Sequence, residues 1–334
     1  MHMIDNCVAI FTKPQTIEFI NQKLPYPQDK FICVKFEYCA ICGGDYSTFL
    51  GRRTDYPYSL GHEFVGKVLS IGQDVTDFNV GDYVVSDLNY RCGKCLYCKN
   101  SQSHLCEKNS IANFSNRAFA MYGNIHAKYL YKIPKLSWLP RACLIEPLSC
   151  VIHACNSIKC KSGMSILICG GGGIGSLFCF YLSRVIRNVN IIVCEQNKNK
   201  LNLLKQSFDI LEYDENSSVK FDWIIDCSNS ISGLDFCLSV CSKGGNLCIM
   251  SHLYGLNTSF VYNTICEKEI NPKFPLRNGN MENMRQAITY INNYWSDKDD
   301  DLIGIYRDLT EAFTNKNNSP FCKQVIDISH LFAI

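Results

Sequence analysis

The sequence predicts a two-domain α/β protein in which a mainly β domain is joined to a doubly wound parallel sheet. Its 334 residues suffice for two domains of ordinary size, each with an apolar core. Short β-rich runs dominate the first part of the chain, and strand-like and helix-like segments alternate after Ala142. We expect the first domain over residues 1–148 and 272–334 and the second over residues 149–271.

The strands of the first domain are short runs of β-branched and aromatic residues that Gly and Asp interrupt, as expected of a largely antiparallel sheet. A helix, a polar SDKDDD loop and a closing strand follow the second domain. The predicted elements are strands at 31–37 (FICVKFE), 65–72 (VGKVLSIG) and 81–85 (GDYVV), a helix at 283–294 and a strand at 323–328 (KQVIDI).

In the second domain, apolar strand-like runs alternate with helix-like segments, which favours a parallel sheet wrapped by helices. The predicted strands are 165–169 (SILIC), 189–194 (VNIIVC), 221–226 (FDWIID) and 246–250 (NLCIM), and the predicted helices include 176–186 and 198–206.

A metal site is predicted in the stretch YCAICGGDYSTFLGRRTDYPYSLGHEF, residues 38–64. It brings Cys42, Asp45, His62 and Glu63 into one short, glycine-rich segment. Zinc accepts thiolate and imidazole ligands, and a catalytic zinc needs only three protein ligands. A third ligand must come from elsewhere in the chain.

Glu146, in LIEPLSCVIHAC, is the candidate for that ligand. Because it precedes Pro147, we expect its backbone just before the helix that starts the second domain, at the seam between the two domains. The alternative is an ordinary acid at a helix N-terminus, where Glu is favoured by the dipole.

A second cluster, within residues 90–108, predicts a closed zinc site. The spacing C-x2-C-x2-C-x7-C places four thiols together, and a tetrahedral site filled by protein is structural. An iron–sulfur cluster and four unligated cysteines are the alternatives. The ligands are Cys92, Cys95, Cys98 and Cys106.

The glycine run after SILIC predicts a dinucleotide site. It fits G-x-G-x-x-G between a strand and a helix, and Glu195 ends the next strand, where a carboxylate accepts hydrogen bonds from a ribose. A carboxylate repels a 2′-phosphate, which favours NAD over NADP. The alternative is a turn that only packs a helix on the sheet. The turn consists of Gly170, Gly171, Gly172, Gly173, Ile174 and Gly175.

The composition argues against nucleic-acid and membrane partners. The formal net charge is +2, no Lys/Arg block stands out and no apolar run reaches membrane-spanning length. We expect a small-molecule substrate. The 21 cysteines are an odd number, and many lie in apolar runs, which favours free thiols in a reducing cytoplasm over disulfides. No signal peptide is expected.

The chain resembles the zinc-dependent medium-chain dehydrogenase/reductase family, and within it the sorbitol and polyol dehydrogenase branch. The resemblance covers nearly the whole chain through CAICGGD, GHEFVGKV, GDYVV, the four-cysteine lobe, IEPLS, GGGGIG with Glu195, FDWIIDCSN and LTEAF. It implies a GroES-like catalytic domain, a Rossmann domain, and a catalytic zinc in the cleft between them. It also implies a homo-oligomer, a dimer or a tetramer, paired through the edge of the Rossmann sheet, for which NLCIM and the following SHLYGLNTSFVYN are candidates.

The resemblance assigns roles to single residues. It implies that Cys42 and His62 are zinc ligands, that Glu146 is a ligand or a partner of the zinc-bound water, and that Glu63 is a weak or transient ligand. Asp45 would orient His62, and Cys39 would pack. The same resemblance places Cys227, in FDWIIDCSN, with the cofactor-binding residues and Arg277 beside the substrate cleft.

Two departures concern the proton path. Relatives usually carry Ser or Thr where this chain has Gly44, and many have a histidine where it has Ser47. A zinc-bound water with Glu146, or Tyr46 or Ser47, would have to serve instead.

The predicted function is reversible, NAD-linked and zinc-dependent oxidation of a secondary alcohol in a polyol or sugar derivative. A sugar-alcohol phosphate dehydrogenase is the close variant. Its phosphate would be held by Arg52, Arg53 and Arg277, aided by Lys273, unless these charges are merely solvated. A non-catalytic NAD-binding protein and a zinc-free quinone or enoyl reductase are further alternatives.

Overall fold

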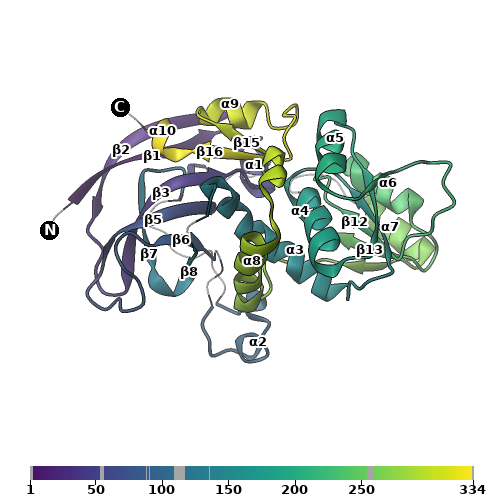
Figure 1. Ribbon diagram of the computed structural model, residues 1–334, viewed down its shortest axis with the longest axis horizontal. Coiled ribbons are helices and arrows are strands. Elements are labelled where there is room, and N and C mark those ends of the chain that lie inside the picture. Colours follow the sequence, from purple (N-terminus) through teal and green to yellow (C-terminus); the bar gives the residue numbers. More distant parts are fainter. Residues whose placement is uncertain are drawn as a thin grey trace.

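The computed structural model describes residues 3–52, 56–87, 89, 91–108, 117–134, 136–253 and 259–332. Figure 1 shows an elongated molecule with a β-rich half, to which both chain ends belong, and an α/β half built from the middle of the chain. This is the two-domain α/β fold that the sequence predicts. The strands lie in three sheets, two in the β-rich half and one in the α/β half. The limits of the two domains stay a prediction.

The β-rich half contains every strand predicted for it. A three-stranded sheet has the order β2-β1-β4, and a larger sheet has the order β15-β16-β3-β5-β6-β8 with β7 on β3. All pairs are antiparallel except β15 with β16. The strands are β1 (Met3–Lys13), β2 (Thr16–Pro25), β3 (Phe31–Ala40), β4 (Tyr58–Ser59), β5 (Glu63–Ile71), β6 (Tyr83–Ser86), β7 (Tyr122–His126), β8 (Leu130–Lys132), β15 (Ile303–Tyr306) and β16 (Lys323–Asp327).

The α/β half is a six-stranded, all-parallel sheet in the order β11-β10-β9-β12-β13-β14. Counted along the chain this order is 3-2-1-4-5-6, which reverses between β9 and β12 and opens a crevice at their carboxyl ends. The strands are β9 (Ser165–Cys169), β10 (Asn190–Cys194), β11 (Leu211–Glu212), β12 (Trp223–Asp226), β13 (Asn246–Ile249) and β14 (Asn271–Lys273). The helices are α4 (Gly173–Tyr181), α5 (Lys198–Ser207), α6 (Ile231–Val240) and α7 (Ser259–Lys268).

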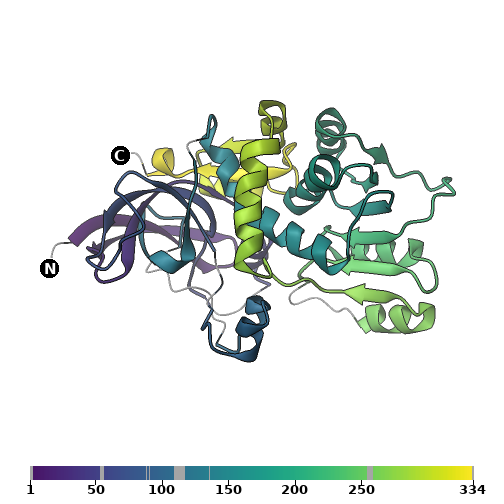
Figure 2. The same cartoon turned by 60° about the horizontal axis from the view of Figure 1, so that its bottom comes forward.

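Two helices join the halves. Figures 1 and 2 show α8 (Met281–Tyr294) crossing between them beside α3 (Ile145–Ser157). The largest core cluster is continuous through this junction and includes Val65 of β5, Leu148 of α3 and Phe178 of α4. This cluster therefore spans both halves, and each half also has a smaller core cluster of its own. None of the described helices combines the length and apolarity that crossing a membrane requires.

The structure corrects four local predictions. NLCIM is not the sheet edge, because β14 pairs with the outer side of β13. The candidate edge segment after it ends in α7, and its residues 254–258 lie outside the described part. The SDKDDD segment is not a loop but a 3-10 helix, η5 (Asp297–Leu302), since its acids cap their own turn. The last turn of the helix predicted at 176–186 is a π-helix, η4 (Leu182–Ile186).

The fourth correction concerns Glu146, which lies inside the first turn of α3 rather than before it. Pro147 is tolerated there because the N–H groups of a first helical turn have no intrahelical acceptor. The preceding 3-10 helix, η3 (Leu139–Leu144), leads directly into α3. The helix thereby fixes the carboxylate of Glu146 at the seam between the halves.

Candidate metal centre and cofactor cleft

Cys42 lies at the N-cap of α1 (Gly43–Phe49), where the sharp turn from β3 into the helix exposes its sulfur to donors. The N–H of Gly44 points at Cys42 Sγ over 3.4 Å, and the carboxylate of Asp45 accepts from the N–H of Cys42 over 3.4 Å. These two contacts hold the Cys42 sulfur in a fixed position at the start of α1.

His62 faces Asp45 across the turn before β5. His62 Nδ1 lies 3.6 Å from Asp45 Oδ1, and both side chains are largely buried. Burial alone would favour the neutral forms of both side chains. The attraction between Asp45 and His62 outweighs burial: it lowers the pKa of Asp45 and, together with the charge of Cys42, raises the pKa of His62. Because Asp45 faces Nδ1, the other ring nitrogen is left to bind a metal, which is how carboxylates orient ligand histidines.

Glu63 completes a compact set of ligand atoms. One atom each from Cys42, His62 and Glu63 lies within 4.8 Å of the other two. A thiolate, an imidazole and a carboxylate form a donor set that suits zinc and leaves a fourth position open. Glu63 also forms an ion pair with Lys323, with Oε2 and Nζ 2.5 Å apart.

Glu146 lies in the same charged neighbourhood but is not part of the compact set. It is 8% exposed, and burial raises its pKa to about 7, assisted by the charges of Glu63 and Asp87 and opposed by those of His62 and Lys323. Cys150, one turn along α3, approaches its Oε1 at 4.0 Å. A carboxyl group of this kind can hold or release a proton near neutral pH.

The side chains that replace the usual proton relay have unequal surroundings. Ser47 is fully buried, and its hydroxyl has no hydrogen-bond partner within the described residues. Tyr46 is also largely buried, and Lys316 Nζ lies 5.0 Å from the centre of its ring. Glu146 is therefore the better placed group for proton transfer.

The structure brings the four cysteines of the lobe together. The four sulfur atoms lie within 4.8 Å of one another, and α2 (Leu96–Lys99) turns the chain between them. The N–H groups of Lys94 and Cys95 point at Cys92 Sγ and lower the pKa of that thiol to about 6. Such donors stabilise metal-bound thiolates, so the geometry suits a tetrahedral zinc. The four residues are Cys92, Cys95, Cys98 and Cys106.

The glycine-rich turn lies in the crevice between β9 and β12. Gly170 has a φ of +100°, which favours glycine, and its N–H donates to the carbonyl of Cys194 over 2.8 Å. The carboxylate of Glu195 accepts from the N–H of Gly171 over 2.6 Å and from that of Asn197 over 2.7 Å. The predicted acid therefore lies beside the turn.

The other predicted cofactor residues surround the same turn. The N–H of Cys227 donates to the carbonyl of Cys169 over 2.8 Å, which holds the end of β12 against the turn. Ile174 packs on the central core. Gly172, Gly173 and Gly175 open α4 as its N-cap and first turn.

We expect Gly175→Ala to destabilise the fold strongly. A Cβ at Gly175 would lie 1.9 Å from the carbonyl oxygen of Gly170. The expected loss in the free energy of unfolding is about 2–4 kcal/mol, measured by chemical denaturation. Gly172→Ala is the matched control, because nothing lies within 4 Å of the added Cβ and we expect a change below about 0.5 kcal/mol. Equal losses in the two variants would contradict this geometry.

Lys323 is the residue that the sequence analysis missed. It is 5% exposed, pairs with Glu63, and its side chain lies so close to Gly173 that a Cβ there would meet Lys323 Cδ at 2.8 Å. It therefore links the metal centre to the glycine-rich turn. The available signal was a lysine at the start of the predicted closing strand KQVIDI.

The arginines proposed for a phosphate have different surroundings. Burial raises the pKa of Tyr46, near the metal centre, and the charge of Arg52 opposes this rise. Arg277 has a φ of +57°. Burial lowers the pKa of His104 in the lobe, and the charge of Arg277 lowers it further. Lys273 is exposed at the end of β14, and Arg53 lies outside the described residues.

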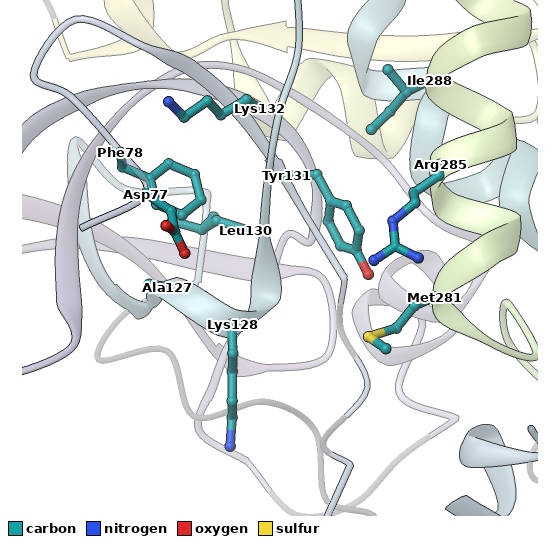
Figure 3. Close-up of a pocket in the computed structure, with 10 residues that line it drawn as sticks. All are labelled: Asp77, Phe78, Ala127, Lys128, Leu130, Tyr131, Lys132, Met281, Arg285 and Ile288. Atoms are coloured by element: carbon teal, nitrogen blue, oxygen red, sulfur yellow. The ribbon is translucent and has the colours of Figure 1, made fainter. Parts of the chain in front are cut away.

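A surface pocket of about 570 Å³ lies elsewhere, between β8 and α8. Figure 3 shows Tyr131 pointing towards Arg285 and Met281, with Lys132 and Phe78 on the opposite wall. No residue of the metal centre or of the glycine-rich turn lines it. This pocket offers no set of ligands or nucleophiles comparable with the cleft.

Comparison with known proteins agrees with this geometry. Residues 28–135 match the alcohol dehydrogenase GroES-like domain. The chain is 35% identical over 156 residues to sorbitol dehydrogenase of Halalkalibacterium halodurans, which covers 46% of each chain. It is 33% identical over 182 residues to D-arabitol-phosphate dehydrogenase of Enterococcus avium, covering 52% of this chain and 50% of the relative. The matched segment thus spans about half the length of these curated relatives.

The fold extends over the whole chain. The solved structure of L-idonate 5-dehydrogenase from Escherichia coli superposes with a TM-score of 0.82, covering 98% of this chain and 99% of that one at 20% identity. At that identity the likeness shows a shared fold. Together with the sequence relatives and the GroES-like match, it confirms the predicted resemblance. The chain therefore contains an alcohol dehydrogenase GroES-like domain and resembles, over its other parts, the sorbitol and polyol dehydrogenases of the medium-chain dehydrogenase/reductase family.

Proposed function

We propose that the protein is a zinc- and NAD-dependent oxidoreductase that interconverts a secondary alcohol of a polyol or sugar derivative and the corresponding ketone. The main observation behind this proposal is the compact set of Cys42, His62 and Glu63. Lys323 pairs with Glu63 and also lies against the glycine-rich turn. A metal-ligand set and a dinucleotide turn in one cleft are what hydride transfer from an activated alcohol requires.

Cys42 and His62 would hold a catalytic zinc, and Glu63 or Glu146 would supply the third protein ligand. When bound, zinc supplies Lewis-acid polarisation of an alcohol oxygen. Asp45 orients His62. Glu146, with a pKa raised to about 7 by burial, accepts or returns the hydroxyl proton within the cleft. Its position in the first turn of α3 fixes it there without help from a mobile loop.

The crevice at the glycine-rich turn would hold NAD(H). The turn admits the diphosphate close to the backbone, and Glu195 accepts hydrogen bonds from the adenosine ribose. Cys227 and Ile174 border the same space. The lobe of Cys92, Cys95, Cys98 and Cys106 would hold a second, structural zinc, since all four positions are filled by protein.

The substrate class rests on the relatives, which include enzymes named for a free polyol and for a phosphorylated one. The free polyol is our first proposal, because Arg52 and Arg277 lie in different surroundings. The phosphorylated variant is the second, favoured by the position of Arg52 beside Tyr46 near the metal centre.

The proposal is tested by NAD reduction on paired substrates, each polyol with and without its phosphate. We expect turnover on at least one free polyol such as sorbitol or ribitol. Exclusive turnover of the phosphates, with loss in Arg52→Gln, would replace the first proposal by the second. A protein that binds NADH but oxidises no alcohol would be a non-catalytic relative and would overturn both.

We further propose a cytoplasmic homo-oligomer, a dimer or a tetramer, whose domains divide at residues 148–149 and 271–272. One of the two outer strands of the parallel sheet is β14, a short edge strand whose backbone could pair with a second copy. Light scattering combined with gel filtration gives the copy number directly. A monomer at micromolar concentration would contradict the oligomer.

A further inference from the structure

Lys316 lies on the loop after α9 (Leu309–Thr314), and this loop is held on both sides. Tyr306 Oη donates to the hydroxyl of Ser319 over 3.0 Å, which ties the loop to β15. Asn197 Nδ2, at the start of α5, donates to the carbonyl of Ser319 over 3.2 Å. Because Asn197 follows Glu195 by two residues, the loop lies at the edge of the dinucleotide crevice.

The side chain of Lys316 lies against the ring of Tyr46. It is half-buried, and its Nζ lies 5.0 Å from the centre of the Tyr46 ring. Tyr46 belongs to α1, one turn beyond Cys42. The ammonium group therefore lies beside α1, whose N-cap is Cys42, while the loop that carries it lies at the edge of the dinucleotide crevice.

Three ammonium groups gather at this place. Burial and the like charges of Lys323 and Lys200 lower the pKa of Lys316 to about 8, against the opposing charges of Cys42 and Glu63. The positive charge of Lys323 is balanced by its ion pair with Glu63. Among the described residues, neither Lys316 nor Lys200 forms an ion pair with a carboxylate. The remaining repulsion among these like charges raises the free energy of the empty site, and a bound anion relieves this cost.

We propose that Lys316 binds the diphosphate of the dinucleotide cofactor, together with Lys323 and the glycine-rich turn. This assignment rests on the proposed function. A diphosphate carries two negative charges, which match two ammonium groups. Its oxygens would accept hydrogen bonds from the turn on one side and from the lysine on the other. The loop that carries Lys316 belongs to the β-rich half, so the contact would couple cofactor binding to the relative position of the two halves.

The test is the dissociation constant of NADH, measured by fluorescence for the intact zinc-loaded protein. We expect Lys316→Met to weaken NADH binding roughly tenfold, as for the loss of one charge-assisted hydrogen bond. Lys316→Arg, which keeps the charge, should restore most of the affinity. Lys298→Met is the matched control, because Lys298 is exposed on η5 and should leave affinity unchanged. ADP-ribose, which keeps the diphosphate and lacks nicotinamide, should show the same loss.

The pH profile separates this role from a structural one. Since the protonated amine binds the anion, NADH affinity should fall as the pH rises from 7 to 9, through the lowered pKa of Lys316. The Arg variant should be flat over that range. The facing groups are Lys323, Lys200, Tyr46, Cys42 and Glu63; the pKa of Lys323 is raised, so that lysine stays charged.

Three outcomes would overturn the assignment. Unchanged NADH affinity in Lys316→Met would show that Lys316 does not contact the diphosphate. A loss confined to NADPH would place Lys316 at a 2′-phosphate instead. A profile as steep in Lys316→Arg as in the natural chain would assign the pH effect to another group. If the natural chain binds no dinucleotide at all, the proposed function itself fails, which is a distinct result.

Discussion

Replacing Cys42 by Ser should abolish turnover while leaving NADH binding nearly intact. A serine hydroxyl is a poor ligand for zinc, so the catalytic metal is lost, and the rate should fall at least about 1,000-fold because Lewis-acid activation of the alcohol is gone. The glycine-rich turn lies on other elements and keeps its geometry. The measurement pairs the turnover rate with the NADH dissociation constant and the zinc content of the same sample.

Cys39→Ala is the control for this variant. Cys39 lies three residues earlier, is fully buried in the β-rich core and is not among the residues of the compact ligand set. We expect it to lower stability but to retain zinc and turnover well below its unfolding temperature. Retained activity in a metal-free Cys42→Ser protein would remove the zinc role from this site.

Replacing Cys98 by Ser should remove the second zinc and destabilise the fold. Structural zinc sites contribute folding free energy directly, so we expect a loss of several kcal/mol and a fall of roughly 10 °C in the midpoint of thermal unfolding. The effect should reach beyond the lobe, because His104 Nδ1 lies 2.8 Å from the carbonyl oxygen of Gly279, which precedes α8. Calorimetry and zinc content measure the two effects.

Cys266→Ser provides the comparison, since Cys266 is an exposed thiol on α7 far along the chain from the lobe. It should keep both zinc ions and the natural midpoint. Iron with visible absorption in the natural protein would assign the lobe to an iron–sulfur cluster instead. Two zinc ions retained in Cys98→Ser would likewise contradict the lobe as their site.

Elements with a strong local signature were predictable from the sequence. The four-cysteine spacing and the glycine-rich turn prescribe short-range geometry, so their sulfur atoms and backbone groups lie together as expected. The alternation after Ala142 likewise predicts the parallel sheet, because each βα unit carries its own pattern. The strands β1 and β2 went unpredicted, since their side chains are mixed and the pairing of β1 with β4 depends on the rest of the half.

Contacts between distant segments were not predictable. Lys323 and Glu63 are far apart in sequence, and only the pairing of β16 with β3 and of β3 with β5 brings them together. The edge of the parallel sheet was predicted wrongly for a different reason. The edge strand β14 contains Pro272 and gives a weak strand signal. Glu146 was predicted to lie before the helix because it precedes Pro147, but proline is also common in the first turn of a helix.

The most direct test of the proposed function follows zinc and NAD reduction together while a chelator removes the metal. We expect NAD reduction on a polyol to fall in proportion to the loss of one zinc per chain, to reach zero while NADH still binds, and to return when zinc is restored. NAD reduction that persists after the Cys42 site has lost its metal would contradict a zinc-dependent dehydrogenase.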